Sequence, residues 1–86
     1  EGEHIERELM LVKIKAVGAQ RAEVKRTADI FRGQIVDVTD AAYTVQVTGA
    51  SSKLDAFIRS IGELSVLEVV RSGVSGLSRG EKVVSL

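Results

Sequence analysis

The chain contains no cysteine, a single histidine and no long apolar run. Without cysteine it can form neither a disulfide framework nor a thiolate site. The absence of cysteine also fits the cytoplasmic location that we expect. The apolar runs are far shorter than the roughly 20 residues that span a bilayer. We therefore expect no association with a membrane.

An excess of positive charge is also missing, since Lys plus Arg and Asp plus Glu number 12 each. Nucleic-acid-binding domains usually carry a basic surface. The three aromatic residues are Phe31, Tyr43 and Phe57, and all of them lie in apolar stripes. We expect them in the core rather than on a base-stacking surface, and we expect no nucleic-acid partner.

Two periodicities divide the chain into six elements. Apolar residues that alternate at period two predict strands, and apolar residues three or four positions apart predict helices. The predicted strands are Glu8 to Val17, Ile35 to Thr39, Ala42 to Thr48 and Ser65 to Arg71. The predicted helices are Arg21 to Arg32 and the stretch that carries Leu54, Phe57, Ile58, Ile61 and Leu64 on one face.

Residues typical of helix ends flank both predicted helices. Gly33 directly follows Arg32, so we expect Gly33 to adopt the left-handed conformation of a helix cap. Ser52 and Asp55 have the spacing of a capping box at the start of the second helix. The residues from about 72 onward are rich in glycine and serine and predict a loop or tail.

The order strand, helix, strand, strand, helix, strand is that of ferredoxin-like α+β domains. It predicts an antiparallel four-stranded sheet with two helices on one face. The 86 residues are enough for one such domain, so we expect residues 1–86 to form a single domain. The chain starts with Glu1 rather than methionine, and we expect it to be a piece of a longer protein.

No cluster of residues predicts a catalytic, cofactor or metal site. His4 stands alone among glutamates near the start of the chain, whereas a metal site needs several fixed ligands. The segment GVSGLSRGEK departs from the spacing of a phosphate-binding loop because Glu81 follows Gly80. An acylphosphatase-like site is excluded because the chain has no asparagine. We expect no enzyme activity, no cofactor and no metal.

The face of the sheet away from the helices predicts an interface. Leu9 and Leu11 alternate with the core residues of the first strand, and Val66 and Val70 are expected beside them on the last strand. Such an apolar patch marks an interaction surface in a small protein, so we expect a homodimer. The alternative is an ordinary solvated face, since polar residues share this face with the four apolar ones and dilute the patch: Lys13, Lys15, Thr44, Gln46 and Glu68.

Five segments together resemble the carboxyl-terminal domain of the small, regulatory subunit of acetolactate synthase, also called acetohydroxyacid synthase. They are RELMLVKIKA, EVKRTADIFRGQIVDVT, YTVQVTG, KLDAFIRSI and EVVRSGVSGLSRGEK. The resemblance implies a partner role: the small subunit of this family binds a catalytic subunit that uses thiamine diphosphate. It raises the activity of that subunit and confers feedback inhibition by valine or related branched-chain amino acids.

The resemblance also implies that the effector binds chiefly to an amino-terminal ACT domain, which this chain does not contain. The candidate contacts with the catalytic subunit lie at and just after the end of the last predicted strand. Arg71 and Arg79 supply long hydrogen-bond donors there, and Gly73 and Gly80 leave the backbone exposed. Two other functions stay open: a module that binds a small effector by itself, and a purely structural dimerisation domain.

Overall fold

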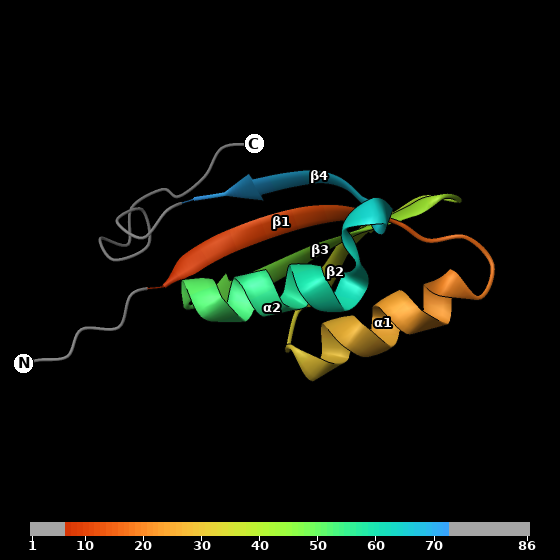
Figure 1. Cartoon of the computed structure of the whole chain (residues 1–86). Helices are drawn as coiled ribbons and strands as arrows, with labels where there is room; N and C mark the ends of the chain where they lie inside the picture. The colour runs from red at the N-terminus through yellow and green to blue at the C-terminus, as the bar shows by residue number, and fades with distance from the viewer. Residues whose placement is uncertain (1–6, 73–86) are drawn as a thin grey trace, which may run out of the picture.

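The computed structural model describes residues 7–72 as four strands and two helices, joined by short connections (Figure 1). The strands are β1 (Glu8–Lys15), β2 (Gln34–Val38), β3 (Ala42–Gly49) and β4 (Val66–Arg71). The helices are α1 (Gln20–Ile30) and α2 (Ser51–Ile61), and a short 3-10 turn, η1 (Glu63–Ser65), leads into β4. The predicted order of elements is confirmed.

The strands form one antiparallel sheet in the order β2-β3-β1-β4. Both helices lie on the same side of this sheet, and they pack chiefly over β2 and β3 (Figure 1). This is the ferredoxin-like βαββαβ fold that the sequence predicted. Strands β2 and β4 are its two edges, and no helix of residues 7–72 lies on the opposite face.

The core lies between the sheet and the helices. The inward residues of β1 and β3 are fully or almost fully buried, as are the centres of both helices: Met10, Val12, Ile14, Val45, Val47, Val24, Ala28, Leu54 and Phe57. The rings of Phe31 and Phe57 meet edge to face with their centroids 5.4 Å apart. The predicted core position of Phe57 is confirmed, and Phe31 and Tyr43 are partly buried and pack against the core.

Arg21 joins the start of α1 to the far end of the sheet. Its Nη1 donates to the carbonyl oxygens of Ala16 at 2.9 Å and Asp40 at 3.0 Å, and its guanidinium lies 4.6 Å from the centre of the Tyr43 ring. Guanidinium groups bind carbonyl oxygens and aromatic faces at once because they are planar and carry several donors. Arg21 therefore fixes the β2–β3 hairpin relative to α1.

The end of α1 differs from the prediction. The residue in the left-handed region is Arg32, with φ 60°, and Gly33 is not left-handed. The N–H of Gly33 donates to Ala28 O at 2.7 Å and that of Arg32 to Asp29 O at 3.0 Å, which is the bonding pattern of a Schellman motif. Gly33 is needed for another reason: a Cβ there would lie 3.0 Å from Val45 Cγ1 and 3.1 Å from Gln46 O.

The start of α2 also differs. Its N-cap is Ala50, and no side chain caps it, so the predicted capping box of Ser52 and Asp55 is wrong. The Asp55 carboxylate accepts a hydrogen bond from Arg71 instead, at 2.8 Å, across the molecule on β4. A long-range ion pair has replaced the local bond that the spacing suggested. Within residues 7–72, neither helix is long and apolar enough to cross a membrane.

Candidate functional site: the helix-free face and its edge strand

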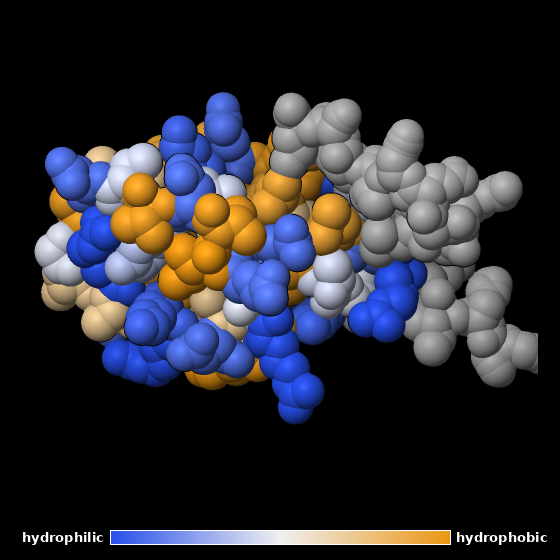
Figure 2. Space-filling view, turned by 180° about the vertical axis from the view of Figure 1, so that it is seen from behind, coloured by the Kyte–Doolittle hydropathy of each residue, from blue (hydrophilic) through white to orange (hydrophobic). Residues whose placement is uncertain are grey.

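The helix-free face has an apolar centre with a polar surround (Figure 2). Leu9 and Leu11 of β1 lie on this face, and Val70 of β4 stands directly opposite Leu11. A shallow hollow of about 340 Å³ lies over them, lined by Leu11, Lys13, Asp37, Thr44, Glu68 and Val70. The predicted placement of three apolar residues on this face is confirmed. Its use as an interface stays a prediction.

Val66 does not lie on this face, and its predicted placement is wrong. The register of β4 against β1 shifts between Lys13 and Ile14, where one extra residue, Leu67, is accommodated in β4. A bulge of this kind reverses the alternation of side chains beyond it. Val66 consequently pairs with Ile14 and packs against the core, while Val70 stays on the open face.

Exposure of apolar side chains is greater along β4 than at the centre of the face. Leu9 and Leu11 are half-buried, because the strands on either side shelter them. By contrast, Leu67 is 52% exposed, and Val69 and Val70 are 42% exposed each. Leu64, in the turn just before β4, is 100% exposed. The apolar surface that the sequence predicted therefore extends over the edge of the sheet.

A polar network closes the other end of β4. Arg71 Nε donates to Glu8 Oε1 at 3.0 Å, and Arg71 Nη1 donates to Asp55 Oδ1 at 2.8 Å. The hydroxyl of Ser51 donates to Glu8 as well, and the backbone N–H of Leu9 donates to Ser72 Oγ at 3.0 Å. These contacts hold the start of β1, the start of α2 and the end of β4 together.

Within this network, Glu8 is the buried charge and Arg71 is its partner. The hydrogen bonds from Arg71 and Ser51 lower the pKa of Glu8 below its usual value, against the opposing effect of burial. The hydrogen bonds with Glu8 and Asp55 raise the pKa of Arg71. The sequence marked Arg71 as a donor to a partner protein, but in the fold its guanidinium is already occupied by two carboxylates.

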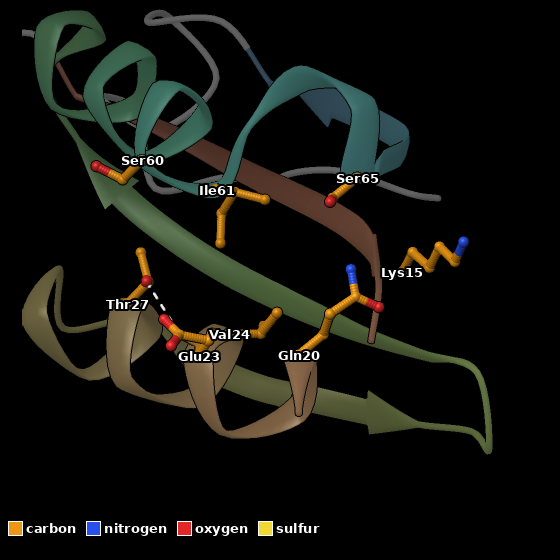
Figure 3. Close-up of a pocket in the computed structure, with 8 residues that line it drawn as sticks. All are labelled: Lys15, Gln20, Glu23, Val24, Thr27, Ser60, Ile61 and Ser65. Atoms are coloured by element: carbon orange, nitrogen blue, oxygen red, sulfur yellow. Dashed lines mark hydrogen bonds between the residues drawn. The ribbon is translucent and has the colours of Figure 1, made fainter. Parts of the chain in front are cut away.

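A second hollow, of about 250 Å³, opens between the two helices (Figure 3). Val24 and Ile61 form its apolar part, and the rest of its lining is polar: Lys15, Gln20, Glu23, Thr27, Ser60 and Ser65. The ammonium of Lys15 points away from the gap (Figure 3), and the Thr27 hydroxyl is used in a 3.0 Å bond to the Glu23 carbonyl. The lining residues that the structure describes therefore do not form a convergent set of free donors.

In the part of the chain from residue 7 to residue 72, no group of three or more His, Cys, Asp or Glu side chains could hold a metal ion. Sequence reasoning missed the pairing of Glu8 with Arg71, since 63 positions separate them. The predicted contact residues Gly73, Arg79 and Gly80 lie outside the described residues.

Comparison with known proteins gives one consistent result. Residues 7–80 match the family model described as the small subunit of acetolactate synthase. The chain is 60% identical, over 85 residues, to the acetolactate synthase isozyme 3 small subunit of Escherichia coli strain K12, covering 98% of the chain and 52% of that protein. It is 59% identical, over 83 residues, to the acetolactate synthase small subunit of Haemophilus influenzae strain Rd, covering 95% of the chain and 51% of that protein.

A solved structure agrees with these sequence matches. The crystal structure of the acetolactate synthase small subunit from Thermotoga maritima has a TM-score of 0.75 and 36% identity, and the match covers 80% of this chain and 42% of that one. The chain thus spans about half the length of the curated bacterial relatives just named. By the match over residues 7–80, the chain belongs to the acetolactate synthase small-subunit family.

Proposed function

We propose that this chain is the carboxyl-terminal domain of a regulatory subunit that binds the thiamine-diphosphate catalytic subunit of acetolactate synthase and modulates its activity. The observation that carries this proposal is the match to the small-subunit family over residues 7–80. The chain itself is non-catalytic in this proposal, and the condensation chemistry belongs to the catalytic subunit. It contributes in this way to branched-chain amino-acid synthesis in the cytoplasm.

Feedback control by valine is a separate part of the proposal. We place the effector site in an ACT domain of the full-length subunit, outside these 86 residues. An effector can change the partner's activity only if two conformations of the subunit differ in affinity for that partner. The present domain would transmit this difference through whichever surface contacts the catalytic subunit.

We propose the helix-free face as that surface. It combines an apolar centre, Leu9, Leu11 and Val70, with charged residues around it, such as Lys13 and Glu68. An apolar core with a polar rim is the usual anatomy of a protein interface. Arg71 is a weaker candidate than the sequence suggested because its guanidinium is bound to Glu8 and Asp55.

The test is to assay the catalytic subunit with full-length small subunit carrying Leu11→Asp. A carboxylate at the centre of the face opposes desolvation, so we expect the concentration of small subunit needed for half-maximal activation to rise about tenfold or more. Gln34→Asp is the matched control, since Gln34 lies on the same face at its far, exposed edge. If the Leu11→Asp subunit activates fully at the same concentration as the unmutated subunit, this face does not contact the catalytic subunit.

Within residues 7–72, the hollow between the helices is the observation that we weigh in favour of an effector-binding module instead. At about 250 Å³ it falls below the roughly 300–1,000 Å³ of ordinary small-molecule sites. Titration of the 86-residue chain with valine, followed by amide chemical shifts, separates the two functions. We expect no saturable shifts. Saturable shifts at Val24 and Ile61 would favour the effector-binding module.

A further inference from the structure

Among residues 7–72, strand β4 pairs only with β1, so its outer edge has no neighbouring strand there. In Figure 1 it runs along the outer side of β1, away from the helices, which pack over β2 and β3. Its apolar side chains are exposed on both faces of the sheet, with Val69 on the helix side and Val70 on the helix-free side. An exposed apolar edge is a template for pairing with another strand.

The direction of the backbone groups in β4 follows from two hydrogen bonds at the ends of β1. Ser72 N–H donates to Leu9 O at 2.9 Å, and Ala16 N–H donates to Ala41 O at 2.8 Å. The backbone N–H and C=O groups of odd-numbered β1 residues therefore point toward β4, and those of even-numbered residues point toward β3. Hydrogen bonding alternates along an antiparallel pair. The backbone groups of Val70 consequently point toward β1, whereas those of Val69 and Arg71 point toward the open edge.

We propose that a second copy of this chain pairs with β4 through its own β4, antiparallel, about a two-fold axis that passes beside Val70. Val69 of each copy then stands opposite Arg71 of the other, and these two residues exchange N–H···O=C bonds through the groups that face the edge. The two sheets join into one continuous sheet. This inference goes beyond the proposed function and does not depend on it.

The sequence of β4 selects this axis among its neighbours. An axis beside Glu68 would set the two Glu68 carboxylates directly opposite each other, which is destabilising. An axis beside Val69 would require pairing by Leu67, where the strand is bulged. The axis beside Val70 uses only the regular segment from Glu68 to Ser72 and sets Glu68 opposite Ser72. The strand is thus complementary to itself in this register.

Charge and packing agree with that register. The Arg71 guanidinium is held by Glu8 and Asp55 of its own chain, so its charge is balanced when Val69 of the other copy packs beside it. On the helix-free face, Val70 meets Val70 of the other copy. Since Leu11 stands opposite Val70 within each chain, an unbroken apolar row would cross both copies.

Cysteine cross-linking tests the register directly, because the chain has no cysteine of its own. Opposed residues that do not share hydrogen bonds have Cα atoms about 4.5 Å apart, within disulfide range. We expect Val70→Cys to give a covalent dimer on mild oxidation. Two control variants should cross-link at least tenfold more slowly. In Val69→Cys the two substituted positions are not opposite each other in the proposed dimer, and in Gln34→Cys the substitution lies on β2, the other edge of the sheet. Equal rates for the three variants would overturn the proposal.

Sedimentation of the 86-residue chain gives the second test. Val70→Lys places two ammonium groups at the axis, so we expect the dimer dissociation constant to rise about tenfold or more. An equimolar mixture of Val70→Lys and Val70→Glu should restore the dimer. Leu11→Lys is the control, because in the proposed dimer position 11 of one copy lies three strand spacings, roughly 14 Å, from position 11 of the other.

Each result of the sedimentation experiments supports or excludes one arrangement of the two copies. Dimers of Leu11→Lys with monomers of Val70→Lys support edge pairing. Monomers of Leu11→Lys with dimers of Val70→Lys would instead support self-association through the centre of the face, as the sequence first suggested. An unmutated chain that stays monomeric at millimolar concentration excludes both arrangements. If Val70→Lys fails to fold, as judged by circular dichroism, the cross-linking rates decide alone. None of these measurements involves the catalytic subunit, so the proposed function stands or fails separately.

Discussion

Replacing Arg71 by alanine should destabilise the domain rather than merely alter its surface. Arg71 supplies the bonds to the Glu8 carboxylate, whose side chain is only 10% exposed, and to Asp55. Removing one partner of a fully buried ion pair costs about 3–5 kcal/mol, because the other charge stays buried. Arg71 is itself 30% exposed and Glu8 keeps its bond from Ser51, so we expect a loss of about 2–3 kcal/mol.

Urea unfolding at neutral pH measures this loss as a shift in midpoint at constant slope. Arg26→Ala is the matched control, since Arg26 forms an exposed pair with Glu23 that is worth less than about 1 kcal/mol. A double-mutant cycle with Glu8→Gln isolates the interaction. Because the two residues are in contact, the sum of the stability losses of the two single mutants should exceed the loss of the double mutant by about 1 kcal/mol or more.

The pH dependence provides an independent check on the same network. Arg71 and Ser51 hold the pKa of Glu8 below its usual value, so the unfolded chain binds this proton more readily than the folded one. The stabilisation is therefore complete above the ordinary glutamate pKa of 4.5, which applies to the unfolded chain. It is lost as the pH falls through the lower, folded pKa. In Arg71→Ala the acid-dependent loss should be much smaller.

One result would refute this reasoning. If Arg71→Ala and Arg26→Ala lower the free energy of unfolding equally, by less than about 0.5 kcal/mol, the network does not stabilise the fold. Arg71 would then be free to act as a contact to a partner protein, as the sequence alone suggested.

Three further changes have defined outcomes. Gly33→Ala should destabilise by about 1–3 kcal/mol, because its Cβ would press on Val45 and Val47 from 3.0 and 3.1 Å, and calorimetry should show a lower Tm. Arg32→Gly should raise the free energy of unfolding in urea by up to about 1 kcal/mol, because Arg32 has φ 60°; an unchanged midpoint would contradict this. Leu64→Lys should change stability by less than about 0.5 kcal/mol, because Leu64 is fully exposed, and a larger loss in urea would show that it packs.

The periodicity of the sequence was sufficient to predict the arrangement of the elements. Met10, Val12 and Ile14 alternate along β1 and Ala16 continues the pattern one residue after its end; in the structure all four are fully buried. Alternation and helical spacing reflect which face of an element is apolar. The order of elements then restricts the topology to few possibilities. For this reason the ferredoxin-like sheet could be predicted without knowledge of any tertiary contact.

Local motifs were less reliable, because tertiary contacts compete for the same groups. Gly33 follows Arg32 at the end of α1, so the usual rule gave the left-handed position to the glycine. In the structure the glycine is used where β3 approaches closely, and Arg32 takes the left-handed conformation. Asp55 was expected to cap its own helix but pairs with Arg71. Neither competing contact is visible in the spacing of nearby residues.

The bulge in β4 had the largest consequence for the candidate site. Alternation counted back from Val70 places Val66 on the helix-free face, but the extra residue at Leu67 turns Val66 toward the core. The same bulge divides β4 into a short part that continues from η1 and a regular part from Glu68 onward. Edge pairing needs a regular ladder, so the bulge limits any added strand to the segment around Val70. The feature that invalidated the prediction for Val66 is therefore the one that defines where a second copy can bind.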